Sequence, residues 1–278
     1  MAYPEIDTWL RSLPSNPAER PMLGVVVDEL RGVLPAGPGC LSTHILRPDL
    51  GHWHGAAFTE VFCQTLARRA GLPATDTELL EGAAVPCSLS RRYDIENGRK
   101  LKSSTFARRL NDDDAPLPFC FALIEEKSND VRADQQVLMD MVLFNALIGN
   151  SLADARFFGM IEDEGGMRIA PLHGALCASI FPHLPQRFAM PIGHAREPLQ
   201  LRTSDWERLA GHTQLEPASL ATRALGLAER VRGESRGLAM SFATGANAHM
   251  VGIMLSSIEQ NCMLVVQSLK VFLTRKAA

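Results

Sequence analysis

The stretch Leu143–Ala178 constrains the fold of this chain most, because a helical pattern and a strand pattern follow each other within it. It begins inside an apolar-rich segment, Asp134–Asn150, which we expect to form one long helix. A hairpin is expected over Met160–Ala170, because Glu164-Gly165-Gly166 separates two runs of strand-like composition. A helix that leads through a short loop into a hairpin favours a fold that mixes the two kinds of element.

The residues before this stretch also mix strands with helices. The alternating segment Cys40–Leu46 predicts a strand, and the two short apolar stretches of Glu78–Arg92 suit paired strands. A helix is expected over Ala56–Ala70, where apolar residues recur at helical spacing before a glycine and a proline. The apolar run Met22–Leu34 has helical spacing after Val26, which predicts a helix there.

The residues that follow are mainly helical. Further helices are expected from Thr203, over Pro217–Val231 and over Asn247–Thr274. The polar segment Arg91–Asp114, with its turn signal Asn97-Gly98, suits a hinge or surface crossing between two lobes. These patterns predict an α+β fold, with a mixed first lobe over residues 1–98 and a helical second lobe over residues 99–278.

Composition places the chain among cytoplasmic globular proteins. Its 278 residues are 46% hydrophobic, which is enough for a large buried core, and the net charge of -3 gives no general attraction to nucleic acid. We see no long uncharged apolar run and no secretory signal, so neither a membrane span nor export is expected. The six cysteines are scattered and are expected to be reduced, and the eight histidines do not cluster as zinc ligands would.

Several short motifs, taken in order, resemble the HipA-like serine/threonine kinases. Leu147-Ile148-Gly149-Asn150 resembles the end of the helix that precedes the family's catalytic loop, and Ser42–Pro48 resembles the strand of its nucleotide-contacting lysine. The order and spacing of such matches, from about Ser42 to Leu209, carry the resemblance. It implies a HipA-like protein-kinase fold with a smaller mixed α/β N-lobe and a larger, mainly helical C-lobe. The short form of the family, without a first N-terminal subdomain, is the more similar one.

The resemblance also implies where the catalytic residues would lie, and most of these positions hold residues that cannot do the chemistry. The catalytic aspartate position is Leu152, the family histidine is Asp154 and the lysine is Arg156. The two metal-binding positions, an asparagine and an aspartate in the family, are Phe157 and Gly174. Hydrocarbon side chains and glycine supply neither a proton acceptor nor the oxygen ligands that magnesium requires.

Two positions of the implied nucleotide cleft keep their charge. Arg47 stands at the lysine position and Glu60 at the position of the helix glutamate, so we expect both to line a vestigial nucleotide cleft. Arginine is longer and planar and does not replace lysine geometrically. The glycine-rich segment is reduced to residues 35–39, where two prolines remove amide donors that could cradle phosphates. His173 is expected to pack beside this cleft.

The leading hypothesis is therefore a catalytically degenerate pseudokinase with a binding or regulatory role and no cofactor. An alternative is an active, atypical serine/threonine kinase that uses ATP and magnesium through displaced acids, namely Asp154 or the hairpin residues Glu162, Asp163 and Glu164. The simpler interpretation makes Asp154 a surface or arginine-paired aspartate, with Arg156 as a candidate partner, and the hairpin acids a solvated tip. A third hypothesis is an effector or interaction protein that reuses the cleft for another ligand.

The expected partner is a protein, either a component of a toxin–antitoxin system or a separate protein like the family's N-terminal subdomain. Direct contact with nucleic acid or membrane is not expected from the charge and hydropathy of the chain. Two further patterns are interpreted as structural. A basic stretch is expected to be a solvated, compensated loop, and an apolar stripe on the last helix is expected to be core. The basic residues are Arg91, Arg92, Arg99, Lys100, Lys102, Arg108 and Arg109, and the stripe is Met250, Ile253, Met254, Ile258, Met263, Val266, Leu269 and Val271.

Overall fold

The computed structural model describes residues 3–28 and 32–277. The first part is built on a five-stranded antiparallel sheet in the order β2-β1-β3-β5-β4. Its strands are β1 (Leu23–Asp28), β2 (Gly32–Pro35), β3 (His44–Pro48), β4 (Thr77–Leu80) and β5 (Cys87–Arg91). One small core joins side chains of this sheet to helix α1 (Pro4–Ser12), and helix α2 (Ala56–Arg69) lies against β3, β4 and β5.

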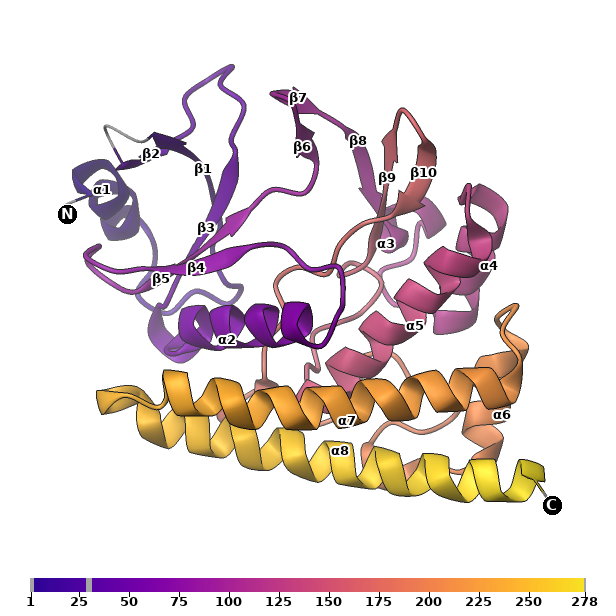
Figure 1. Ribbon diagram of the computed structural model, residues 1–278. Helices are drawn as coiled ribbons and strands as arrows, with labels where there is room; N and C mark the ends of the chain where they lie inside the picture. Colours follow the sequence, from indigo (N-terminus) through magenta and orange to yellow (C-terminus); the bar gives the residue numbers. More distant parts are fainter. Residues whose placement is uncertain (1–2, 29–31, 278) are drawn as a thin grey trace.

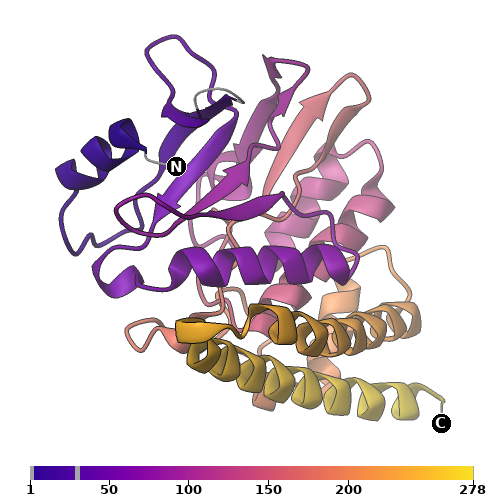
Figure 2. The same cartoon turned by 60° about the vertical axis from the view of Figure 1, so that its left-hand side comes forward.

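The helix α2 lies between this sheet and the long C-terminal helices (Figures 1 and 2). It begins after Gly55, whose backbone has a left-handed φ of 89°, and it is followed by Gly71, which also has a φ of 89°. Eleven of its fourteen residues are buried, including the charged Glu60. A helix covered by a sheet on one side and by helices on the other needs apolar residues all round, with any buried charge paired.

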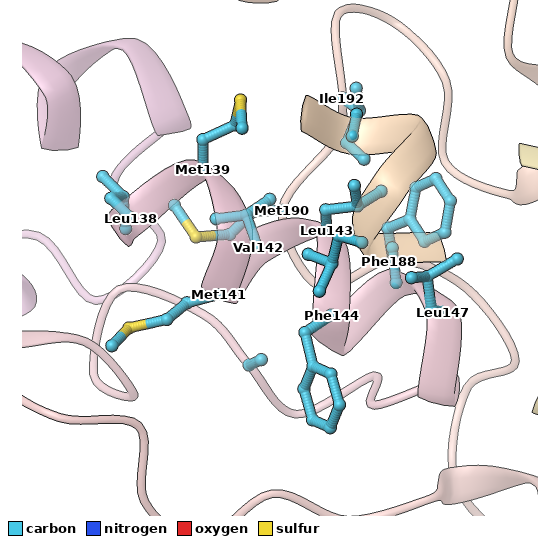
Figure 3. Packing of buried hydrophobic residues seen from close by; sticks show 14 of the residues in the cluster. Leu138, Met139, Met141, Val142, Leu143, Phe144, Leu147, Phe188, Met190 and Ile192 are labelled. Atoms are coloured by element: carbon cyan, nitrogen blue, oxygen red, sulfur yellow. The ribbon is translucent and has the colours of Figure 1, made fainter. Parts of the chain in front are cut away.

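The core of the second part forms around helix α5 (Val131–Ile148), which ends at Gly149 with a left-handed φ of 69°. Its side chains pack against α4 (Leu117–Lys127) and against the loop that carries Phe188, Met190 and Ile192 (Figure 3). Asp130 caps the N-terminus of α5, since its side chain accepts a hydrogen bond from the backbone N–H of Ala133.

Two long helices form the base of the molecule and run side by side along almost their whole length (Figure 1). They are α7 (Pro217–Phe242) and α8 (Ala248–Ala277), and the shorter α6 (Thr203–Gly211) crosses near their far end. Within the described residues, α8 is the one helix whose length and mean hydropathy of 1.2 would suit a membrane span, a property that core helices of soluble proteins share. Many of its apolar residues form a buried face that packs on α7 and α5.

Between the two parts lie smaller elements. A two-stranded hairpin of β6 (Ile95–Glu96) and β7 (Arg99–Lys100) is followed by β8 (Lys102–Thr105), which joins β9 (Gly159–Asp163) and β10 (Gly166–Ile169) in a second sheet of order β10-β9-β8. The short helix α3 (Phe106–Leu110) follows β8. Single 3-10 turns are spread along the chain at η1 (Gly51–Trp53), η2 (Ala178–Ile180), η3 (Pro198–Gln200) and η4 (Gly245–Asn247).

Most expected elements are confirmed. The helices α2, α5, α6 and α8, the strand pair β4–β5 and the hairpin β9–β10 lie where the sequence places them. The helix α7 begins at the expected Pro217 but continues past its expected end at Val231 to Phe242. The turn at Asn97-Gly98 is the tip of the β6–β7 hairpin, where both residues have positive φ. The expected boundary after residue 98 falls at this tip and stays a prediction.

Two expectations need correction. The helix expected after Val26 is wrong, because this segment is the β1–β2 hairpin; residues 29–31 lie outside the described residues. Three consecutive β-branched valines, Val25–Val27, outweigh the brief helical spacing. The strand expected over Cys40–Leu46 begins only at His44, since residues 40–42 have no regular structure and Thr43 forms a bend.

Candidate functional site

The carboxylate of Glu60 is fully buried and lies between two arginine side chains. Glu60 comes from the middle of α2, and Arg47 comes from β3 in the sheet beneath it. One guanidinium nitrogen of Arg47 lies 3.2 Å from Oε1 of Glu60, and one nitrogen of Arg20 lies 2.5 Å from Oε2. The structure thus brings together Arg47 and Glu60, which the sequence assigned to one cleft.

The strand β5 completes this cluster with two hydroxyl groups. Ser88 lies opposite Arg47 in the register of the sheet and donates a hydrogen bond of 2.6 Å to Glu60, and Ser90 donates one of 3.3 Å. Arg20 also donates to the backbone carbonyl of Arg47 and to Oγ of Ser88. The Glu60 carboxylate therefore accepts hydrogen bonds from four side chains, which we call the Glu60 cluster: Arg20, Arg47, Ser88 and Ser90.

The cluster fixes the charge state of Glu60. Burial by itself raises the pKa of this carboxyl, but the Arg20 and Arg47 guanidiniums and the Ser88 hydroxyl outweigh burial and lower the pKa to about 2. Burial lowers the pKa of Arg47, and Glu60 opposes that effect. Glu60 and Arg47 are both charged at neutral pH, and each stabilises the charged form of the other.

Sequence reasoning missed Arg20. This arginine lies outside the helices and strands, in the segment between α1 and β1, and its side chain is only 8% exposed. No local pattern marks it, because its partner Glu60 lies 40 residues away in the chain. Because Arg20 is present, Glu60 has two cationic partners, and Arg47 is not its only counter-ion.

The loop after α5 places Leu152 in an apolar environment. Its side chain is half-buried and packs with a small cluster of Trp53, Ala56, Leu176 and Phe181. The backbone N–H of Leu152 donates to the side chain of Asn150. At the position that would hold the catalytic base, the structure therefore has a hydrocarbon side chain that packs between segments.

Asp154 is held by Arg156 in this same loop. The guanidinium of Arg156 donates to both carboxylate oxygens, at 3.2 and 2.6 Å, and its backbone N–H donates to Oδ1 at 2.9 Å. An arginine-paired aspartate was expected, and the pairing is confirmed. Residues two apart on a helix would face different ways, but the loop is a series of turns, which allows the contact.

An aromatic stack occupies the two positions at which the family would bind metal. The ring of Phe157 is parallel to the imidazole of His173, with 5.6 Å between centroids and an angle of 7°. A Cβ atom built on Gly174 would lie 3.7 Å from two carbons of the Phe157 ring. The imidazole also contacts Tyr93, which follows β5, at 5.0 Å between centroids. We call Tyr93, Phe157 and His173 the aromatic stack.

The aromatic stack carries no charge at neutral pH. Burial lowers the pKa of His173, and the nearby Arg47 guanidinium lowers it further. Burial also raises the pKa of the Tyr93 hydroxyl. His173 packs against the rings of Phe157 and Tyr93, as expected for a packed rather than a catalytic histidine.

Two acidic side chains of the β9–β10 hairpin pair with neighbouring cations. Asp163 accepts a hydrogen bond of 2.6 Å from Arg168 and another from the backbone N–H of Gly165, and Glu162 pairs with Lys102 at 3.4 Å. Glu164 is exposed at the tip. Among the described residues, no three histidine, cysteine or acidic side chains gather as a metal site would require.

The positions implied for magnesium do not fit that ion. The side chains at Phe157 and Gly174 offer no oxygen ligand. The only carboxylate of the loop, that of Asp154, already accepts hydrogen bonds from three nitrogens of Arg156. The ion pair of Arg47 and Glu60 joins α2 to β3 within the first part, and the aromatic stack joins Tyr93 of the first part to His173 and Phe157 of the second. This arrangement does not provide the metal ions and the base that phosphoryl transfer uses.

Comparison with known proteins gives the same family for most of the chain. Residues 25–235 match the family described as HipA-like C-terminal domain. A curated protein of Sinorhizobium fredii, named "Putative kinase Y4mE", is 25% identical over 186 residues. The match covers 62% of this chain and 44% of that protein, so the chain spans less than half the length of this relative.

Solved structures show the same fold at low sequence identity. The toxin–antitoxin protein HipA of Shewanella oneidensis, in a complex described as HipA, HipB and operator DNA, superposes with a TM-score of 0.85 at 15% identity. That match covers 98% of this chain and 72% of HipA. The proinflammatory kinase CtkA of Helicobacter pylori superposes with a TM-score of 0.63 at 9% identity, covering 91% of this chain and 94% of CtkA.

Proposed function

The chain belongs to the family of HipA-like C-terminal domains and has the HipA-like kinase fold, and from that premise we propose that it is a pseudokinase with a binding or regulatory role. A kinase fold alone does not fix activity, because function depends on the groups in the site. The site of this chain lacks the base and both metal ligands at their family positions.

The observation that carries the proposal is the contact of Phe157 with His173 beside Gly174. An aromatic ring lies where a metal ion would need two oxygen ligands, and a leucine that packs on apolar neighbours replaces the base. At the same time the Glu60 cluster keeps Arg47 and Glu60 in contact. This combination supports a domain that retains the shape of a kinase and has lost its chemistry.

The alternative of an atypical active kinase is supported less well. Three of the four carboxylates named for a catalytic role have a cationic partner: Asp154 with Arg156, Asp163 with Arg168, and Glu162 with Lys102. The fourth, Glu164, is exposed at the hairpin tip. Recruiting Asp154 would require breaking its bidentate contact with Arg156, and charge-assisted contacts of this kind are the stronger ones.

The partner we propose is a protein of a toxin–antitoxin system in the cytoplasm. HipA of Shewanella oneidensis was solved together with HipB and DNA, and its likeness to this chain covers 98% of the residues. A separate protein equivalent to the family's N-terminal subdomain is the second partner that we propose.

Thermal unfolding with and without nucleotide tests the proposal. We expect ATP with magnesium to leave the melting temperature unchanged, because a ligand stabilises only a fold that binds it. A matched variant with Phe157→Asn and Gly174→Asp, which returns both metal ligands, serves as the comparison. A rise of several degrees for the natural chain, present with magnesium and absent with EDTA, would overturn the proposal.

A further inference from the structure

A cavity of about 620 Å³ lies far from the Glu60 cluster in the chain, between the start of α6 and the last turns of α8. One wall comes from the segment of η3 and α6, and the other comes from the solvent side of α8 near its C-terminus. The residues that give the cavity its chemical character are Leu199, Arg202, Glu207, Val271, Arg275 and Lys276.

Apolar side chains in this cavity are exposed to solvent. Leu199 is 67% exposed and Val271 is 48% exposed, although both are large hydrophobic residues. They come from opposite walls, one from η3 and one from α8. Exposed apolar residues that share one hollow and have polar neighbours are typical of an interaction site.

The charges around this apolar patch are mainly positive. Three of the charged residues are cations and one is an acid, and that acid, Glu207, already pairs with Lys276 at 3.1 Å. Arg202 donates to the carbonyls of Leu199 and Leu201, which hold its guanidinium without neutralising it. Within the ranges that the structure describes, neither Arg202 nor Arg275 has a carboxylate in salt-bridge contact.

We propose that this cavity binds an acidic, amphipathic segment of a partner protein. An apolar side chain of that segment would lie on Leu199 and Val271, and flanking carboxylates would face Arg202 and Arg275. The chain as a whole carries a net charge of -3, so the local positive charge gives selectivity for an acidic ligand that the rest of the surface repels.

Two other occupants suit the cavity less well. A second copy placed symmetrically would bring Arg202 and Arg275 close to the same residues of its partner, and like charges oppose that contact. The phosphate backbone of nucleic acid would gain contacts with two arginines but would leave Leu199 and Val271 without apolar cover.

Fluorescence anisotropy with designed peptides tests this proposal. One labelled peptide alternates glutamate and leucine, a second alternates lysine and leucine, and a third alternates glutamate and serine. We expect the full-length chain to bind the first peptide about tenfold or more tightly than the other two. Raising the salt concentration should weaken binding of the first peptide, because exposed charges are screened.

Matched variants locate the contact. Arg275→Glu and Val271→Ser should each weaken binding of the first peptide severalfold, and both replace exposed side chains, so folding should be retained. Arg99→Glu, on the exposed strand β7, is the control for a change of overall charge and should leave binding unchanged. Circular dichroism confirms that each variant is folded.

Several results would contradict the proposal. Equal affinity for the lysine peptide, or unchanged binding by both cavity variants, would remove the cavity as the site. Tighter binding of a DNA duplex that is lost in Arg275→Glu would assign the cavity to nucleic acid. A dimer in sedimentation that Arg275→Glu dissociates would assign it to a second copy. None of these outcomes depends on whether the chain binds ATP, so they test the cavity separately from the pseudokinase proposal.

Discussion

Glu60 is a charged residue that has no exposure to solvent. Its carboxylate is wholly buried, and its charge persists because Arg20, Arg47 and two serines donate to it. Replacing a buried ion pair as a whole can be neutral, but removing one member leaves the others uncompensated. In this cluster the removal of Glu60 would leave two arginines without a counter-ion.

The first prediction follows from this arrangement. Glu60→Gln keeps the shape of the side chain and removes its charge, and we expect it to lower the free energy of unfolding by about 3 to 5 kcal/mol. Urea titration at neutral pH measures this difference. The control is Glu78→Gln on β4, an exposed glutamate whose replacement should change stability by about 0.5 kcal/mol or less.

The difference in stability between the natural chain and Glu60→Gln should depend on pH. The folded pKa of Glu60 is lowered to about 2 from an ordinary value of 4.5, so its contribution is fully present above about pH 4.5 and is lost as the pH falls toward 2. The stability of the natural chain should therefore approach that of Glu60→Gln on acidification. A difference that stays constant between pH 7 and pH 3 would show that the charge of Glu60 is not what stabilises the fold.

The site could be predicted from the sequence only as far as local motifs reach. Arg47, Glu60, Phe157 and Gly174 each lie in a recognisable motif, and the structure places them in two adjoining contacts. Arg20 could not be found in this way, because it lies in a segment without regular structure and its partner is distant in the sequence. The number of counter-ions of a buried charge is a property of the folded chain.

At the scale of elements, helix α8 shows why an apolar pattern and a buried face can differ. The expected stripe is right for its buried members Met254, Ile258 and Leu269 and wrong for Ile253, Met263 and Val271, which are 38%, 54% and 48% exposed. The stripe combined residues from two sides of the helix. The buried side also includes residues that the stripe left out: Val251, Cys262, Val265 and Phe272.

Two substitutions on α8 provide the second prediction. Ile258 is fully buried in the main core, whereas Met263, little more than a turn later, is 54% exposed. We expect Ile258→Ala to lower the free energy of unfolding by about 2 to 5 kcal/mol, because it removes apolar contact and leaves a cavity. Met263→Ala should change it by about 0.5 kcal/mol or less. Equal effects in thermal or urea unfolding would mean that the two faces of α8 are not distinguished as the structure shows.

The hairpin β1–β2 is the element that the pattern assigned to the wrong class. The run of Val25–Val27 suits an extended backbone, and Gly32 begins β2 with a φ of 82°. Helical spacing over so few residues carries little information, and pairing with β3 decides the outcome. A long helix such as α5 was predicted well because many residues repeat the same period, whereas α7 was expected to end at Val231 and ends at Phe242.

At the scale of the whole molecule, the two parts of the chain meet at the aromatic stack, where the charge of Arg47 in the Glu60 cluster also acts on His173. Arg47 and Tyr93 come from the first part, and Phe157 and His173 come from the second, so each part contributes side chains to this meeting point. In an active kinase such a place would hold nucleotide and metal. In this chain the rings of Tyr93, His173 and Phe157 contact one another there.

The last prediction concerns phosphoryl transfer by the complete chain. We expect no incorporation of radiolabelled phosphate into the protein itself or into a generic protein substrate, because base, metal ligands and lysine are all replaced. Restoring one residue, as in Leu152→Asp, should not produce activity, since groups that act as a unit are not additive. Gly174→Asp alone faces a further obstacle, because position 174 has a left-handed φ of 64°, which residues with a side chain rarely adopt. Asp154→Asn is the decisive control: incorporation by the natural chain that disappears in this variant would show that Asp154 leaves Arg156 to act as the base, and the pseudokinase proposal would then have to be abandoned.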